Sequence, residues 1–264
     1  MASTILHAFS GLMSILNRGL AWLDFGVHYV SGYLLYYLFR GLKPQTHTRP
    51  GVRNGRIHSP SVVVTGASEG IGLAIALRLA SGGYNVVATV KDESEIRKVK
   101  DAVYDVESKI MAARGDLHVT VMDILSRESI NNCVDHISTV LDGDEDKPLV
   151  CVINNAGLCL ISPMELTKDD DVRRMFELDL FAYIAVIQAF LPIIKLNKGR
   201  FIYIGSFGGF TNVPMWVPYC AVKAAIDAMT RAWRFELMPF GVGESASYLL
   251  ESNWNIASLL PGQA

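Results

Sequence analysis

The chain alternates short apolar runs with segments of helical periodicity over most of its length. Five runs rich in apolar or β-branched side chains are typical of strands: Ser61–Thr65, Asn85–Val90, Leu117–Met122, Leu149–Ile153 and Arg200–Gly205. Helical patterns separate them, among them Ile71–Ala80 and Val172–Leu196. This alternation implies right-handed crossovers and a parallel sheet that helices cover on both faces. We therefore expect one α/β domain with a doubly wound parallel sheet over residues 60–264.

The first 40 residues have a different pattern. Apolar side chains recur at helical spacing from Ile5 to Leu16, which predicts an amphipathic helix. From Leu20 to Phe39 the chain is mostly apolar over about the ~20 residues that cross a bilayer core. Residues 1–40 are therefore expected to form a retained membrane anchor, as transmembrane helix or hairpin, with a helix docked on the domain as the alternative. No Lys or Arg precedes the first apolar run, which disfavours a cleaved signal peptide.

Residues 41–59 read as a basic linker, because prolines and glycines recur there with little apolar content. Only Arg18 precedes the apolar stretch, whereas five cations follow it: Arg40, Lys43, Arg49, Arg53 and Arg56. The positive-inside rule then places the following domain in the cytosol, and we expect the membrane to be the endoplasmic reticulum. These cations are either solvated or in contact with anionic membrane lipid.

Composition narrows the range of partners. The formal net charge is −2 and the pI near 6.3, which gives no basic face for nucleic acid. Four cysteines form no CxxC pattern and six histidines form no HExxH pattern, so neither a disulfide framework nor a metal site is indicated. The cysteines fit better as small buried fillers.

Two patterns point to chemistry. The turn Thr65-Gly66-Ala67-Ser68-Glu69-Gly70-Ile71-Gly72 follows a strand and opens a helix, the context in which backbone N–H groups receive a pyrophosphate. Further on, Tyr219 follows Ser206 by 13 residues, and Lys223 lies four residues beyond. On a helix Tyr219 and Lys223 share one face, so the ammonium can favour the phenolate of a tyrosine whose free pKa is about 10. Together these patterns predict a hydride-transfer site.

The same motifs carry a family resemblance. The turn is similar to TGxxxGxG, Asn154-Asn155-Ala156-Gly157 to NNAG, and Tyr219-Cys220-Ala221-Val222-Lys223 to YxxxK. In this order they resemble the short-chain dehydrogenase/reductase family over roughly residues 60 to 242, nearest in style to its steroid and retinol dehydrogenases. The resemblance implies an oxidoreductase that interconverts a secondary alcohol and a ketone on a small apolar substrate, such as a steroid, retinoid or keto-lipid. It leaves a homodimer open.

The resemblance also implies roles for individual residues. Proton transfer is assigned to Ser206, Tyr219 and Lys223, with Asp179 beside them. Tyr219 and Lys223 are also expected to contact the cofactor, together with a larger set: Gly66, Ser68, Glu69, Gly70, Ile71, Gly72, Lys91, Asp123, Ile124, Asn155, Ala156 and Gly157. Val90 stands where NAD-preferring relatives carry an acid, and Lys91 where many NADP-preferring ones carry a cation. NADP is therefore expected, and the nearby acids Asp92 and Glu69 keep NAD open.

Two departures from the family pattern affect this expectation. Asp179 stands where the family carries an Asn, and a carboxylate cannot donate as an amide does and would offset the charge of Lys223. A catalytically weak cofactor-binding scaffold is therefore the alternative function. In addition, Gly243–Trp254 departs from the family, and Asn255–Leu260 with the Pro-Gly turn after it resembles a displaced sixth strand. We expect this tail to leave the strand Arg200–Gly205 partly uncovered and the substrate without a lid.

Overall fold

The structure is a computed structural model that describes residues 51–53, 56–104, 107–112, 115–141 and 146–247. The predicted membrane anchor over residues 1–40 lies outside these residues, as does the tail from residue 248 onward. The stretch predicted as a linker contains a short antiparallel hairpin of β1 (Gly51–Arg53) and β2 (Arg56–His58). The domain boundaries drawn from the sequence stay predictions.

Within the described residues, six parallel strands form one sheet in the order β5-β4-β3-β6-β7-β8. They are β3 (Ser61–Val64), β4 (Asn85–Val90), β5 (Asp116–Val121), β6 (Leu149–Asn154), β7 (Arg200–Ile204) and β8 (Gly243–Ser247). All residues of β3, β4 and β6 are buried, because helices cover both faces of a parallel sheet. The strand order reverses between β3 and β6, and ligands of such folds bind at that point, outside the carboxyl ends of the strands.

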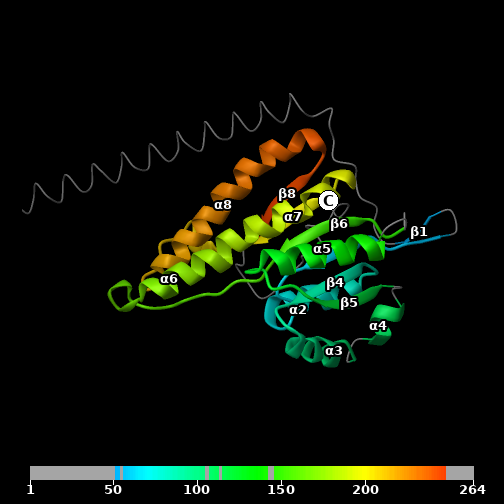
Figure 1. Ribbon diagram of the computed structural model, residues 1–264, viewed down its shortest axis with the longest axis horizontal. Helices are drawn as coiled ribbons and strands as arrows, with labels where there is room; N and C mark the ends of the chain where they lie inside the picture. Colours follow the sequence, from blue (N-terminus) through cyan, green and yellow to red (C-terminus); the bar gives the residue numbers. More distant parts are fainter. Residues whose placement is uncertain (1–50, 54–55, 105–106, 113–114, 142–145, 248–264) are drawn as a thin grey trace, which may run out of the picture. The chain divides into compact units, whose positions relative to one another are not determined.

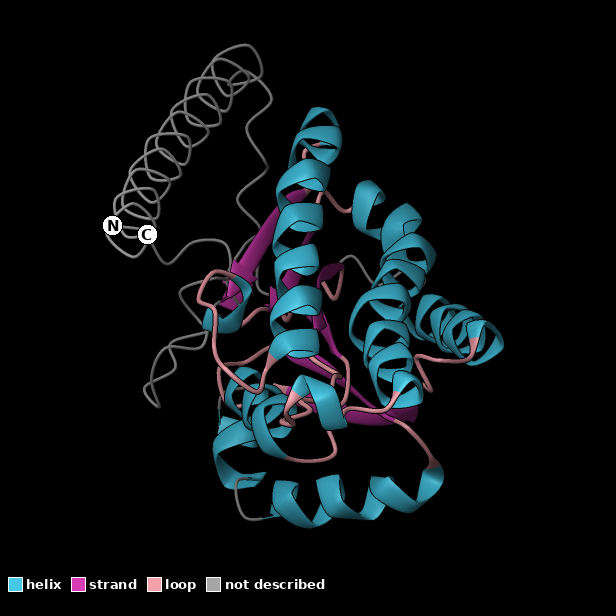
Figure 2. Cartoon of the chain, turned by 90° about the vertical axis from the view of Figure 1, so that its left-hand side faces the viewer, coloured by secondary structure: helices cyan, strands magenta, loops and turns pink. Residues whose placement is uncertain are grey.

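Helices cover the two faces of this sheet (Figures 1 and 2). One face packs against α2 (Gly70–Ala80), α3 (Ile96–Tyr104) and α4 (Glu107–Ala112), and the other against α5 (Arg127–Leu141), α7 (Ala182–Leu196) and α8 (Val217–Leu237). Ile75, Leu79 and Val99 belong to the first core, whereas Ile130, Phe190 and Ile226 belong to the second. The predicted doubly wound α/β fold is confirmed.

The long helical pattern before β7 is not one regular helix. It consists of α6 (Asp169–Phe176), a π-helical turn over Glu177–Phe181, and α7. Among the described residues, the run Asp169–Leu196 is also long and apolar enough to span a membrane by length and composition. However, Tyr183, Phe190 and Ile194 of α7 are buried in the second core, between the helix and the sheet. Packing in the domain therefore accounts for its apolar character.

The expected position of the sixth strand is wrong. The segment Gly243–Ser247, which looked foreign to the fold, forms β8 and pairs in parallel with β7 from Arg200↔Gly243 to Ile204↔Ser247. The edge of β7 that was expected to be open is therefore covered. The backbone needs no apolar side chains for this pairing, since the ladder bonds come from N–H and C=O groups alone.

Candidate active site

The glycine-rich turn has the backbone geometry that its sequence predicts. Gly66 and Gly70 adopt φ values of 63° and 56°, which L side chains rarely adopt. A Cβ at Gly66 would lie 2.8 Å from Ala156, so the turn approaches the end of β6 closely. Nothing lies within 4 Å of a Cβ built on Gly70, which leaves open space at the N-terminus of α2.

Asn155 and Thr65 hold the turn against the end of β6. The Asn155 side-chain amide donates to the carbonyls of Thr65 (2.9 Å) and Gly66 (3.0 Å). In return, Thr65 Oγ1 accepts from the backbone N–H groups of Asn155 (2.9 Å) and Ala156 (3.0 Å). The amide of Asn155 is therefore engaged in shaping the turn. The sequence prediction did not include Thr65 as part of the site.

The remaining predicted cofactor residues lie at the carboxyl edge of the sheet. Lys91 is exposed directly after β4, and Glu69 and Ile71 are exposed at the start of α2, whereas Ser68 is buried. Asp123 follows β5, where its Oδ1 accepts from Leu125 N–H at 3.0 Å, the bond of an ordinary turn residue. Ile124 is buried in the second core.

The first turns of α8 position the proton-transfer residues. Pro218 at the start of the helix fixes φ, and Tyr219 and Lys223 then lie one turn apart on one face. Lys223 is 6% exposed, and its Nζ lies 5.4 Å from the Tyr219 ring centroid. The structure thus brings the predicted pair together.

Ser206 and two aromatic rings complete the surroundings of Tyr219. Ser206 lies two residues after the end of β7 and is buried. Its Oγ accepts a hydrogen bond from Gly208 N–H at 3.2 Å. Burial raises the pKa of Tyr219, and a hydrogen bond with Ser206 opposes that rise. Trp216 packs edge-on against Tyr219 with ring centroids 5.5 Å apart, and Phe207 packs against Trp216. The sequence prediction missed both aromatic residues, whose only signal is their closeness to the motif.

Asp179 is the least expected member of the site. Its carboxylate is fully buried, Oδ2 lies 3.1 Å from Lys223 Nζ, and Oδ1 accepts from Leu158 N–H at 2.8 Å. Lys223 Nζ also donates to the carbonyl of Ile204 at 3.4 Å. Burial raises the pKa of Asp179, while the Lys223 ammonium opposes the rise. A direct ion pair therefore occupies the place where the family pattern has an amide.

Gly157 and the π-helical turn make room for this ion pair. A Cβ at Gly157 would lie 3.0 Å from Asp179 Oδ2, so a larger residue would displace the carboxylate. Asp179 is the middle residue of the turn Glu177–Phe181, which packs against α8. π-helical turns interrupt α-helices mostly at functional sites, and here the turn is the segment that presents Asp179 to Lys223.

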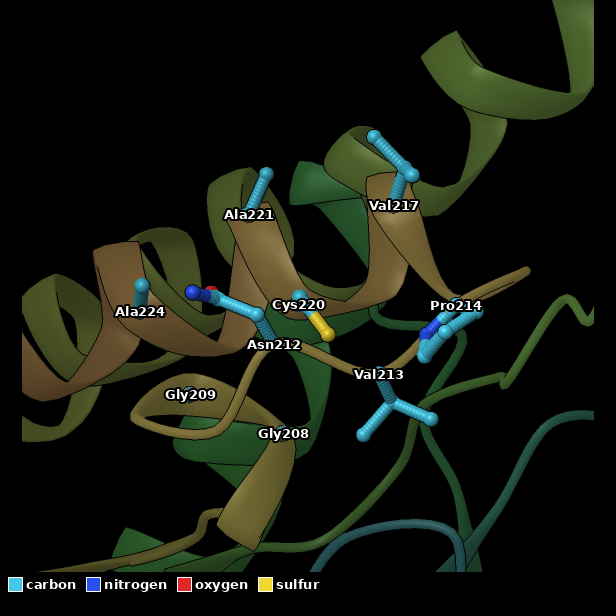
Figure 3. Close-up of a pocket in the computed structure, with 9 residues that line it drawn as sticks. All are labelled: Gly208, Gly209, Asn212, Val213, Pro214, Val217, Cys220, Ala221 and Ala224. Atoms are coloured by element: carbon cyan, nitrogen blue, oxygen red, sulfur yellow. The ribbon is translucent and has the colours of Figure 1, made fainter. Parts of the chain in front are cut away.

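A hollow of about 590 Å³ lies beside these groups (Figure 3). One wall is the helix surface with Val217, Cys220 and Ala224, and the other is the loop after β7, which includes Asn212 and Val213. Within the described residues, neither Ser206 nor Tyr219 lines it. The hollow is mostly apolar and adjoins the loop that carries Ser206, but it does not contain the proton-transfer groups.

Comparison with known proteins agrees with this geometry. The family model described as short chain dehydrogenase matches residues 60–246. Human 17-beta-hydroxysteroid dehydrogenase type 1 is 32% identical over 185 residues, which cover 69% of this chain and 53% of that protein. Mitochondrial D-beta-hydroxybutyrate dehydrogenase of Bos taurus is 30% identical over 190 residues, which cover 70% of this chain and 52% of that protein. The chain thus spans about half the length of these curated relatives.

Solved structures show the same fold. A metagenomic short-chain oxidoreductase in complex with NADP matches with a TM-score of 0.66 and 27% identity, over 78% of this chain and 92% of that one. An NADPH-bound short chain oxidoreductase from Pseudomonas aeruginosa PAO1, described as containing an atypical catalytic centre, matches with a TM-score of 0.61 and 26% identity, over 69% of this chain and 67% of that one. Sequence motifs, fold and relatives agree, and the chain belongs to the short-chain dehydrogenase family.

Proposed function

We propose that this protein is a nicotinamide-dependent oxidoreductase that interconverts a secondary alcohol and a ketone on a small apolar substrate. One observation carries the proposal: Ser206, Tyr219 and Lys223 converge at the carboxyl edge of the sheet, beside the glycine-rich turn. NADP is the proposed cofactor and NAD the alternative. The relatives that bind NADP or NADPH support this choice.

The residues of the turn fit a dinucleotide. Within the described residues, the Glu69 side chain gives α2 no capping hydrogen bond, and the space above Gly70 is open. The first N–H groups of the helix are therefore available to a pyrophosphate, which the helix dipole also attracts. Lys91, at the end of β4, would meet the adenosine ribose or its phosphate. When bound, the nicotinamide supplies the hydride acceptor or donor.

Tyr219 exchanges the proton of the reaction. In ketone reduction its hydroxyl donates a proton to the substrate oxygen, and in alcohol oxidation the phenolate accepts that proton. The Ser206 hydroxyl holds the same oxygen in position. Burial raises the pKa of Tyr219, and the Asp179 charge adds to that rise. The Lys223 ammonium, with Nζ 5.4 Å from the ring centroid, would favour the phenolate and oppose both effects. Asp179 partly offsets that ammonium, because it carries the opposite charge 3.1 Å away.

The loops around the site support an apolar substrate. Ile161, Met164 and Leu166 after β6 are large and exposed, as are Phe210 and Met215 after β7. A hydrogen bond from Ser162 N–H to the Met215 carbonyl, 2.9 Å long, joins the two loops. Large exposed apolar side chains that gather at one place mark binding surfaces for apolar groups.

Membrane anchoring is part of the proposal and rests on the sequence of residues 1–40. An endoplasmic reticulum location, a domain facing the cytosol, contact with membrane lipid, and a homodimer are proposed with it. An anchor would suit a substrate that partitions into lipid, because the substrate would be concentrated beside the domain.

Turnover tests the proposed function. The full chain in detergent or vesicles is incubated with NADPH or NADH and a panel of ketones that includes a 17-ketosteroid, a retinoid with a ring ketone and a long-chain keto-lipid. We expect cofactor oxidation with at least one ketone, and a rate lower by about 10²-fold or more with Tyr219→Phe. Binding of NADPH with no turnover on any ketone would contradict the oxidoreductase proposal.

The second candidate is a cofactor-binding protein with little catalysis. The buried Asp179–Lys223 ion pair favours it, because a carboxylate next to the ammonium weakens the support of the phenolate. Cofactor binding is common to both candidates, so only turnover distinguishes them.

A further inference from the structure

The start of α2 and the start of α3 bring opposite charges together at the adenosine end of the expected cofactor site. Lys98 Nζ lies 3.5 Å from Glu69 Oε2, and the two side chains are 54% and 78% exposed. Glu69 is the residue before α2 and belongs to the glycine-rich turn. The ammonium of Lys98 is therefore positioned at the turn, although the residue is remote from it in sequence.

The packing of α3 fixes this orientation. Val99 is fully buried in the first core, and Ile96 packs against the same core. Lys98 is adjacent to that anchor, so its stem starts from a fixed point of the helix. Arg97 pairs along the helix instead, with Nε 3.7 Å from Asp101 Oδ2. Lys98 thus differs from its neighbour in the partner that it reaches.

The acids at the end of β4 are already engaged in local structure. Asp92 Oδ1 accepts from both the backbone N–H and the hydroxyl of Ser94, as the capping residue of the turn Glu93–Glu95. The hydrogen bond with Ser94 lowers the pKa of Asp92. Glu95 Oε2 accepts from Lys91 N–H at 3.0 Å. Glu69, in contrast, belongs to the glycine-rich turn itself.

We propose that Lys98 is a specificity-determining residue for the 2′-phosphate of the cofactor, acting together with Lys91 and exchanging its partner Glu69 for the phosphate. This inference rests on the proposed function, since it names how the same site selects NADP. Without Lys98, the Glu69 carboxylate would repel a second anion at this place. NAD carries a 2′-hydroxyl in place of the 2′-phosphate, so it brings no such anion and gains little from the ammonium. Glu69 and Lys98 therefore act in opposite directions on cofactor choice.

Binding of two nucleotide probes tests the inference without turnover. 2′,5′-ADP and 5′-AMP differ in the 2′-phosphate, and isothermal titration with the full chain measures Kd for each. We expect Lys98→Ala to weaken 2′,5′-ADP about five- to tenfold, the size of one ordinary hydrogen bond lost from an exposed side chain, and 5′-AMP less than about twofold. Glu69→Gln is expected to tighten 2′,5′-ADP alone. Lys100→Ala, an exposed cation two residues along the same helix, is the matched control and should change neither probe.

The outcomes separate the inference from the proposed function. If the unmodified chain binds 5′-AMP as tightly as 2′,5′-ADP, the NADP preference and the inference both fail. If the unmodified chain prefers 2′,5′-ADP and Lys98→Ala leaves the ratio of the two Kd values unchanged, only the inference fails. Equal losses for Lys98→Ala and Lys100→Ala would also overturn it, because general positive charge would then explain the effect.

Discussion

Asp179→Asn tests how the buried ion pair controls the catalytic tyrosine. The replacement keeps the size of the side chain and an oxygen that can accept from Leu158 N–H, which lies 2.8 Å from Oδ1. It removes the negative charge 3.1 Å from Lys223 Nζ. The Lys223 ammonium would then act on Tyr219 without an opposing carboxylate, and the pKa of Tyr219 should fall.

The size of this fall follows from the geometry. Lys223 Nζ lies 3.1 Å from Asp179 Oδ2 and 5.4 Å from the Tyr219 ring centroid, so the carboxylate lies within about 10 Å of the phenol. At an effective dielectric constant of about 20, a charge at that distance changes the free energy of the phenolate by about 1.5 kcal/mol. The pKa of Tyr219 should therefore fall by about one unit in Asp179→Asn.

Two measurements check this fall. In alcohol oxidation, the acidic limb of the kcat/KM profile against pH should move to lower pH by about one unit, because the phenolate form is required. An ultraviolet titration of tyrosinate, with Tyr219→Phe as the reference for the other tyrosines, gives the same pKa without turnover. An unchanged or raised pKa of Tyr219 would refute the reasoning, since it would show that the Asp179 charge does not reach the phenol.

Four further predictions concern the proton donor Tyr219, Gly157, Asp179 and residues 1–40. Tyr219→Phe should lower kcat by about 10²-fold or more with nearly unchanged cofactor Kd, because only the proton donor is lost, and a near-normal kcat would remove the assignment. Gly157→Ala should lower the free energy of unfolding by about 1–3 kcal/mol in denaturant titrations, because its Cβ would lie 3.0 Å from Asp179 Oδ2, and an unchanged midpoint would contradict that close contact. Burial raises the pKa of Asp179 above its usual 3.8, because the folded protein favours the neutral carboxyl. The resulting contribution to folding stability is complete below that value and is lost as pH rises through the raised pKa. Asp179→Asn should not show this loss when thermal midpoints are measured at stepped pH. Deletion of residues 1–40 should release the protein from membranes that otherwise retain it through alkaline extraction, and continued retention would place the membrane contact elsewhere.

The fold and the main motifs could be predicted because local sequence determines them. A glycine-rich turn between an apolar strand and an apolar helix has few other structures available, and Gly66 and Gly70 do adopt positive φ. Tyr219 and Lys223 are four residues apart on one helix, so their shared face follows from helix geometry alone. Strand periodicity located β3 to β7 within about one residue at each end.

The partners of Asp179 could not be predicted in the same way. Its bonds to Leu158 and Lys223 join three segments that are distant in sequence, and the π-helical turn that carries it gives no periodic signal. The aromatic support of Tyr219 by Trp216 depends likewise on ring positions that spacing does not specify. Sequence showed which residue departs from the family, and only the structure shows that the departure forms a direct ion pair.

The sixth strand shows where propensity fails. Gly243-Glu244-Ser245-Ala246-Ser247 contains no β-branched or aromatic residue, so its composition argues against a strand. Its position argues for one, because Gly241 turns the chain at φ 74° and Gly243 N–H then donates to the Gly199 carbonyl at 2.9 Å. From there each residue meets a partner on β7, whose backbone groups would otherwise be an open edge. Hydrogen bonding to the exposed backbone of β7 therefore outweighs the weak strand propensity of the segment. Because β8 runs parallel to β7, it ends at the edge of the sheet where Ser206 lies.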